Sequence, residues 1–87
     1  MNDEVKKAVA LKYNPEEDRA PVIVAKGRGE VAEKIIKIAK EKGIPITEDE
    51  NLVEALIKID LYEEIPPELY EAVAKVIAFV TLKLKGL

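Results

Sequence analysis

The chain contains no cysteine, no histidine and no tryptophan, and it has only one phenylalanine and one methionine. Without cysteine it can form neither disulfides nor thiolate sites, which is typical of cytosolic proteins. Without histidine it lacks the commonest general base and the commonest metal ligand of proteins. We therefore expect a protein that is not an enzyme and that carries no metal and no cofactor.

Long apolar runs are absent as well. The most apolar stretch, residues 76–82, is far shorter than the roughly 20 residues that a membrane-spanning helix needs. The polar residues 1–7 do not resemble a secretory signal peptide. The 14 basic and 17 acidic residues are interleaved and give a net charge of −3, so no basic stripe favours nucleic-acid binding.

The remaining composition suits one small folded domain. Of the 87 residues, 48% are hydrophobic and 36% are charged, which favours a folded chain and leaves no room for a second core. We predict an α/β fold with α+β character, in which a small mixed sheet of about three short strands is wrapped by three helices. Residues 1–7 are expected to form a flexible N-terminal segment, and residues 8–87 the domain.

Three short segments have the composition of strands. Residues 8–13 are apolar apart from Lys12, and residues 22–24 are β-branched throughout, which is typical of a strand covered on both faces. Residues 44–46 predict a third, very short strand. The strand–helix–strand unit over residues 21–46 should have parallel strands and a right-handed crossover.

The first predicted helix follows Gly29 and ends at Gly43, with Pro45 two residues beyond it. Its period of 3.6 residues places four apolar residues on one face and two more beside them: Val31, Ile35, Ile38 and Ala39, with Ala32 and Ile36. The second helix is expected to start at Thr47, because Thr47 and Glu50 have capping-box spacing.

The last predicted helix starts with Pro67 at its first position and runs to about Lys83. It is apolar around more of its circumference than burial in a domain of this size requires. We assign Val73, Val76 and Val80 to the core. Apolar residues on its other faces, together with the start of the second strand, predict a partner-binding surface, with burial in the core as the alternative: Ala20, Pro21, Tyr70, Ala74 and Ile77.

Gly27-Arg28-Gly29 lies between a predicted strand and a predicted helix, where backbone N–H groups often bind phosphate. An anion or nucleotide site is one reading. A tight turn is the favoured one, because no third glycine and no Gly-Lys-Ser/Thr ending follows.

Acidic clusters occur at residues 16–18, 48–50 and 63–64, where paired carboxylates can hold a metal ion or move protons. None has the spacing of a known calcium loop, so we interpret them as solvated charge near helix starts and connections. Asn14-Pro15 is interpreted as a turn.

The order and spacing of these segments resemble the cytoplasmic C-terminal domain of the FlhB/YscU family of flagellar and type III secretion export-switch proteins. The resemblance rests on residues 8–13, 20–27, 32–39, 44–46 and 65–74. It implies a small sheet wrapped by helices and a substrate-specificity switch that acts by binding other proteins. Expected partners are proteins of the export apparatus or export substrates.

The family's self-cleavage motif, Asn-Pro-Thr-His, precedes the first strand, and here Asp3, Glu4, Val5 and Lys6 stand in its place. We therefore expect no catalytic residues, an intact chain, and a stand-alone protein without the family's membrane domain. It should be cytoplasmic or peripheral to the membrane export gate. Two alternatives remain open: an anion-binding domain using Gly27, Arg28 and Gly29, and a regulatory or vestigial paralogue of a full-length export-switch protein.

Overall fold

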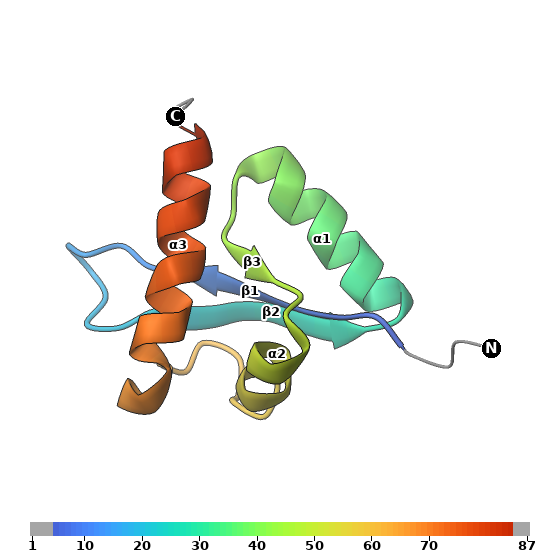
Figure 1. Cartoon of the computed structure of the whole chain (residues 1–87), viewed down its shortest axis with the longest axis horizontal. Coiled ribbons are helices and arrows are strands. Elements are labelled where there is room, and N and C mark those ends of the chain that lie inside the picture. The colour runs from blue at the N-terminus through green and yellow to red at the C-terminus, as the bar shows by residue number, and fades with distance from the viewer. Residues whose placement is uncertain (1–4, 85–87) are drawn as a thin grey trace.

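The computed structural model describes residues 5–84 as a three-stranded sheet with α-helices on both faces (Figure 1). In chain order the elements are β1 (Lys7–Lys12), β2 (Val22–Arg28), α1 (Glu30–Lys42), β3 (Ile46–Thr47), α2 (Glu50–Leu56), the 3-10 helix η1 (Pro67–Leu69) and α3 (Tyr70–Leu84). These elements confirm the predicted class of three short strands and three helices. Predictions that concern residues 1–4 lie outside the described residues.

β1 is the central strand of the sheet, whose order is β2-β1-β3. All four residues from Ala8 to Leu11 are buried, so β1 is covered on both faces. Both neighbours run antiparallel to β1. β2 and β3 therefore run in the same direction, as predicted, but β1 separates them. Each hydrogen-bonded pair is antiparallel, so the sheet is antiparallel and not mixed as predicted.

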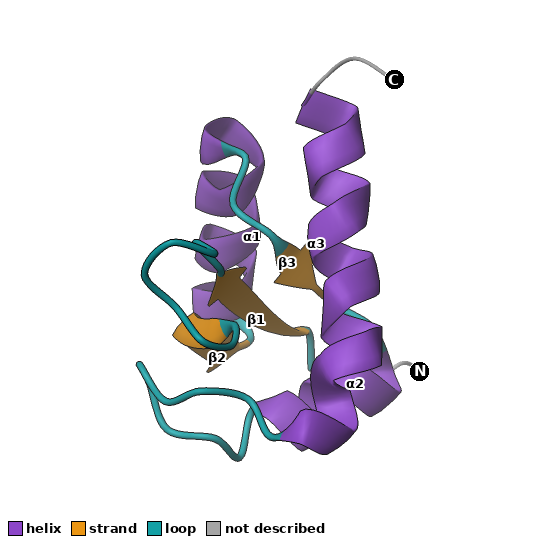
Figure 2. Ribbon diagram, turned by 90° about the vertical axis from the view of Figure 1, so that its left-hand side faces the viewer, coloured by secondary structure: helices purple, strands orange, loops and turns teal. Residues whose placement is uncertain are grey.

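The helices divide the molecule into layers (Figure 2). α1 covers one face of the sheet, α2 covers the other, and α3 runs along the side of β3 (Figures 1 and 2). Within residues 5–84, none of the helices combines the length and the apolar character needed to cross a bilayer. The larger core cluster lies between the sheet, α2 and α3 and contains Val9, Leu11, Ile23, Val53, Leu56, Ile65 and Val73.

α1 confirms the predicted helix ends but not the predicted buried face. Gly43 has φ 69° and its N–H donates to the Ala39 carbonyl, as expected for a C-terminal glycine. Val31 and Ile38, however, are 54% and 48% exposed, and the buried residues of the helix are Ala32, Ile36 and Ala39. A close approach of the helix to the sheet explains the difference, because it favours small side chains at the contact.

The glycine of β2 allows that approach. A β-carbon built on Gly27 would lie 2.9 Å from Cβ of Val31 and 3.4 Å from Cδ1 of Ile35, so any larger residue would push α1 away. Gly27 is thus a packing position.

The start of α2 differs from the prediction. Asp49 is the N-terminal cap, and its Oδ1 accepts a hydrogen bond from the Leu52 N–H at 2.9 Å. Thr47 belongs to β3, and its hydroxyl accepts from the Asp49 N–H at 3.2 Å, so the capping box predicted at Thr47 and Glu50 is wrong. Pairing with β1 outweighs the local capping signal.

β3 lies one to two residues later than predicted, at Ile46–Thr47 instead of residues 44–46. Pro45 has no N–H to give to the ladder, but its carbonyl accepts a hydrogen bond from the Leu11 N–H at 2.8 Å. Pro67 opens a helical turn as expected, although this turn is the 3-10 helix η1, and α3 begins at Tyr70.

Candidate functional site

An apolar groove of about 310 Å³ lies between α3 and the loop that joins β1 to β2. Its lining comes from two segments that are about 50 residues apart in the chain: Tyr13, Arg19, Ala20 and Pro21 from the loop, and Tyr70, Ala74, Ile77 and Ala78 from α3. All five residues predicted to bind a partner thus lie in one groove. The structure brings them together, and their binding role stays a prediction.

The loop over residues 13–21 is organised by Asn14. The Asn14 carbonyl accepts hydrogen bonds from the N–H groups of Glu17 and Asp18 at 3.0 and 2.7 Å, and its Oδ1 accepts from the Glu16 N–H at 3.0 Å. In return the Asn14 N–H donates to Oδ2 of Asp18 at 2.8 Å. The turn predicted at Asn14-Pro15 is therefore present, and its internal bonds fix Tyr13 at one end of the groove.

The other end of the loop is fixed by the segment that precedes η1. The Ile65 N–H donates to the Pro21 carbonyl at 3.0 Å, and Val22 forms a bridge with Glu64. Ala20 is only 2% exposed, so it forms the floor of the groove rather than its rim. Nε of Arg19 lies 3.9 Å from Oε2 of Glu64, with the Arg19 side chain almost fully exposed.

α3 presents its groove residues at spacings of four, three and one, which place Tyr70, Ala74, Ile77 and Ala78 on one side of the helix. Val73 is fully buried in the larger core cluster, and Val76 packs against that cluster, as predicted for both. The side chain of Val80, which was also assigned to the core, lies outside those that the structure describes. Ile77 packs against the same cluster and also lines the groove, so the core side and the groove side of α3 meet at this residue.

The surface chemistry of the groove is apolar with polar edges. Tyr13 and Tyr70 are 39% and 44% exposed, and Ala74 and Ala78 are exposed alanines that leave room for an entering side chain. A tyrosine ring offers apolar contact area and a hydroxyl that can donate or accept a hydrogen bond. This arrangement is suited to an apolar side chain of a partner protein.

Three lining residues, Tyr13, Arg19 and Ala78, were not among the predicted set. Ala78 follows Ala74 by four residues, so helical spacing alone could have identified it. Tyr13 and Arg19 reach the groove only because the Asn14 turn folds the loop back toward α3.

The surroundings of Gly27 and Gly29 argue against an anion site. Such a site needs free N–H groups, whereas both glycines serve the packing and the turn. Gly29 has φ 60°, and its N–H donates to the Lys6 carbonyl at 2.7 Å. Glu30 and Glu33 occupy the first turn of α1, where their charge disfavours an anion. These contacts favour the tight turn over the anion site at Gly27, Arg28 and Gly29.

Residues of the acidic clusters stabilise the local structure around them. Asp49 caps α2, and Asp18 binds the Asn14 N–H. Among residues 5–84 no group of three or more acidic side chains converges in a way that could hold a metal ion.

An ion pair joins the sheet to α2. Nζ of Lys7 on β1 donates to Oε1 of Glu54 on α2. The hydrogen bond and charge of Lys7 hold the pKa of the Glu54 carboxyl below its ordinary value, with smaller help from Arg28 and Lys58.

Among proteins of known sequence, the chain is similar to the flagellar biosynthetic protein FlhB of Aquifex aeolicus, with 49% identity over 79 residues. That match covers 90% of this chain but only 23% of FlhB. The chain is also 46% identical over 76 residues to the uncharacterized protein YlqH of Bacillus subtilis, covering 87% of this chain and 82% of YlqH.

Solved structures share the fold. The cytoplasmic domain of FlhB from Shewanella putrefaciens superposes with a TM-score of 0.76 at 39% identity, covering 87% of this chain and 64% of that one. The PscU C-terminal domain gives a TM-score of 0.74 at 28% identity, covering 86% and 96%. Residues 4–80 match the family described as FlhB, HrpN, YscU and SpaS, so the chain belongs to this family of export proteins.

Proposed function

We propose that this chain is a cytoplasmic, non-enzymatic interaction module of a flagellar or type III export apparatus. In this proposal the groove between α3 and residues 13–21 binds a component of the export apparatus or an export substrate. The family membership supports an export-related role.

One observation carries the proposal. Two segments about 50 residues apart form a single apolar groove, and within it two tyrosines are roughly 40% exposed, at 39% and 44%. Exposed aromatic side chains around an apolar depression are typical of protein-recognition surfaces. Their exposure has no role in packing the core, whereas binding a partner would bury them.

The test is binding between the purified chain and either the cytoplasmic domain of the other gate protein of the export apparatus or a hook-type export substrate. Ala78→Asp places a charge in the groove at an exposed position, so it should weaken binding at least tenfold and leave the fold intact. Ala72→Asp is the matched control, because Ala72 is exposed on the same helix and does not line the groove.

Ala20→Asp is unsuitable for this purpose, although the sequence alone marked it as a useful variant. Ala20 is 2% exposed, so a carboxylate there would be buried without a partner and would destabilise the domain. If the unmodified, folded chain binds neither protein, the proposal fails.

The absence of self-cleavage is part of the same proposal. Asp3, Glu4, Val5 and Lys6 occupy the positions of the family's Asn-Pro-Thr-His motif and supply no asparagine for cyclisation. The purified chain should keep its full mass on storage, and a fragment cut between Asp3 and Glu4 in the mass spectrum would contradict this.

A second candidate function is regulation of a longer export-switch protein by competition for its partner. Its support is that Bacillus subtilis has both relatives: the chain spans 82% of YlqH but only 21% of the FlhB of the same strain. Competition would be seen as displacement of a full-length export-switch protein from the shared partner by the unmodified chain, with no displacement by Ala78→Asp.

A further inference from the structure

The segment between α2 and η1 places two large apolar side chains in solvent. Among the described residues Tyr62 is the most exposed large apolar residue, at 74%, and its neighbour Leu61 is 45% exposed. The Glu63 N–H donates to the Asp60 carbonyl at 3.2 Å, which closes a turn with Leu61 and Tyr62 at its centre. This Leu61–Tyr62 turn, residues 60–63, contributes neither central side chain to the buried clusters.

The backbone of Tyr62 is strained. Its φ is 66°, a left-handed conformation that glycine or asparagine ordinarily supplies at the third position of a turn. A tyrosine there brings its β-carbon close to the backbone, whereas glycine would adopt the same φ without that cost. The ring does not offset the strain by packing in the core. Folding alone therefore does not account for a tyrosine at this position, whereas contact with a partner would.

The turn is fixed to β2 at two points. The Tyr62 N–H donates to the Ile23 carbonyl at 2.7 Å. Nζ of Lys26 donates to the Ile57 and Ile59 carbonyls at 3.0 and 2.8 Å, so it holds the chain just before the turn. A segment that is already ordered loses little conformational entropy when it binds. The two exposed side chains are thus presented by a backbone that does not need to rearrange.

The surroundings of the turn are acidic. Residues 58–71 carry five acidic side chains and one basic side chain. Asp60 and Glu63 stand at the two ends of the turn, and both are exposed. Neither carboxylate takes part in a hydrogen bond or an ion pair within residues 5–84. The turn therefore combines an apolar centre with two unpaired negative charges.

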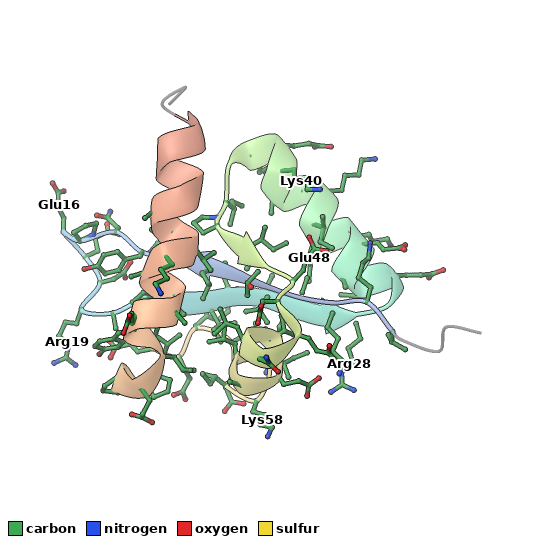
Figure 3. All side chains as sticks on the ribbon, viewed as in Figure 1. Glu16, Arg19, Arg28, Lys40, Glu48 and Lys58 are labelled. Atoms are coloured by element: carbon green, nitrogen blue, oxygen red, sulfur yellow. The ribbon has the colours of Figure 1, made fainter. Side chains whose placement is uncertain are left out.

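The basic side chains near the turn have other contacts or directions. The ammonium group of Lys26 is bonded to the two carbonyls before the turn. Nε of Arg19 lies 3.9 Å from Oε2 of Glu64. Figure 3 shows Lys58 extending from the lower side of the molecule beneath α2, and Arg19 extending from the other end of that side. The carboxylates at the ends of the turn are therefore left to pair with cations of another molecule.

We propose that the Leu61–Tyr62 turn inserts into an apolar pocket with a basic rim on another protein. The Tyr62 ring fills the pocket, and Leu61 covers its edge. Lysine or arginine side chains on the rim meet Asp60 and Glu63, which selects the partner by charge. The same two carboxylates repel anionic lipid and nucleic acid, so the occupant is a protein.

A second copy of this chain does not offer such a pocket. The groove between α3 and residues 13–21 is apolar, but Arg19 is the one charged residue that lines it. Arg19 already faces Glu64 of its own chain, so the groove lacks a basic rim that could receive Asp60 and Glu63. The partner is therefore a different, basic protein.

The turn and the groove are separate surfaces. None of residues 60–63 lines the groove. The proposal therefore does not depend on the function proposed for the groove, and the groove residues Tyr13 and Tyr70 serve as internal controls. Both are less exposed than Tyr62, at 39% and 44%.

The test is an NMR titration of the full chain with β-cyclodextrin that carries an amino group on every glucose. This probe has an apolar cavity and a cationic rim, as the proposed pocket does. We expect the largest shifts at Leu61 and Tyr62, with weaker binding at Tyr13 and Tyr70. Binding at Tyr62 should be at least fivefold tighter than with unmodified β-cyclodextrin, and carboxylated β-cyclodextrin should bind more weakly than either.

Variants of Tyr62 separate recognition from stability. Tyr62→Gly should abolish the shifts at the turn and raise the melting temperature by about 4 °C, because it removes the ring and relieves the backbone. Tyr62→Phe keeps the ring and should bind the amino form within about twofold of the unmodified chain.

A charge variant tests the rim. Asp60→Asn combined with Glu63→Gln should remove the preference for the amino form over unmodified β-cyclodextrin. The matched control combines Glu48→Gln with Glu50→Gln, which removes two exposed carboxylates at the start of α2, and should keep that preference.

Four results would overturn the proposal. Equal binding of the three cyclodextrins at Tyr62 would remove the role of charge. A lower melting temperature for Tyr62→Gly would assign the ring to the fold. Shifts at Leu61 and Tyr62 that grow with protein concentration alone would assign the turn to self-association, and shifts there with vesicles of anionic lipid would assign it to a membrane.

Discussion

The two faces of the sheet are packed in different ways. On the face of α2 and α3, large side chains such as Leu11, Leu56 and Ile65 fill the larger core cluster. On the face of α1, the buried cluster is Ala8, Ala32 and Ile36, and Gly27 lets the helix approach the strand. One face is stabilised by buried volume and the other by close approach, so substitutions of opposite kinds should damage them.

The exposed apolar residues follow the same division. The groove lies beside α3, which Val73 anchors in the larger cluster, so apolar residues on its other side are left for a partner. On the other face, Val31 and Ile38 of α1 are exposed, because Ala32 and Ile36 make the buried contact with Ala8. Exposed apolar surface therefore has a different structural origin on each side.

The largest expected effect is loss of volume on the α2 face. Leu56→Ala should lower the free energy of unfolding by about 2–5 kcal/mol, because Leu56 is fully buried and a cavity would remain. Urea unfolding would measure it. Leu61→Ala is the control, since Leu61 is 45% exposed and should lose less than about 1 kcal/mol. Equal losses for the two leucines would contradict the assignment of the core.

The α1 face should respond to added volume. Gly27→Ala is expected to cost about 1–3 kcal/mol, because its new methyl group would overlap Val31. Val31→Ala alone should cost little, since Val31 is 54% exposed, and it should recover part of the loss in the double variant. Strict additivity of the two substitutions would show that α1 does not approach Gly27 as described.

A smaller effect is expected at the cap of α2, the helix that closes the larger cluster. Asp49→Ala should cost about 1 kcal/mol by removing the acceptor for the Leu52 N–H. Asp60→Ala should be nearly neutral, because no hydrogen bond or ion pair involves the Asp60 side chain in the described part of the chain. Equal losses for Asp49→Ala and Asp60→Ala would contradict the assignment of Asp49 as the cap.

The smallest effect concerns the free energy of unfolding at acidic pH. The pKa of Glu54 is lowered in the folded chain by Lys7, so folding is favoured where the carboxyl is ionised. This contribution is fully present above the ordinary value of 4.5 and is lost as the pH falls through the lowered value. Glu54→Gln should therefore flatten the fall in stability between about pH 6 and pH 3. Glu68→Gln, which has no ion pair within residues 5–84, should leave that fall unchanged.

Much of the fold could be predicted from local patterns. Gly43 and Pro45 mark the end of α1, and the β-branched run from Val22 to Val24 marks β2, because these signals act over a few residues. The buried face of α1 could be predicted only in part. Hydropathy favours Val31 and Ile38, whereas the buried contact is made by Ala32 and Ile36, which cluster with Ala8 of β1.

The groove, too, has residues that could be predicted from the sequence and residues that could not. Tyr70, Ala74 and Ile77 share one side of a helix, so their spacing predicts that they act together. The membership of Tyr13 and Arg19 depends on hydrogen bonds within the Asn14 turn, which lies far from α3 in the sequence. The position of β2 at the edge of the sheet also required the strand order, because a sequence pattern does not tell which strand is central.

The central claim is that the groove between α3 and residues 13–21 is a binding surface. It is tested most directly by NMR mapping of the chain with the cytoplasmic domain of the other export-gate protein, or with a hook-type substrate, in slight excess. The account predicts that the strongest shifts occur at Tyr13, Tyr70, Ala74 and Ala78 and that Ala78→Asp removes them. Binding with shifts confined to other residues, unchanged by Ala78→Asp, would contradict it.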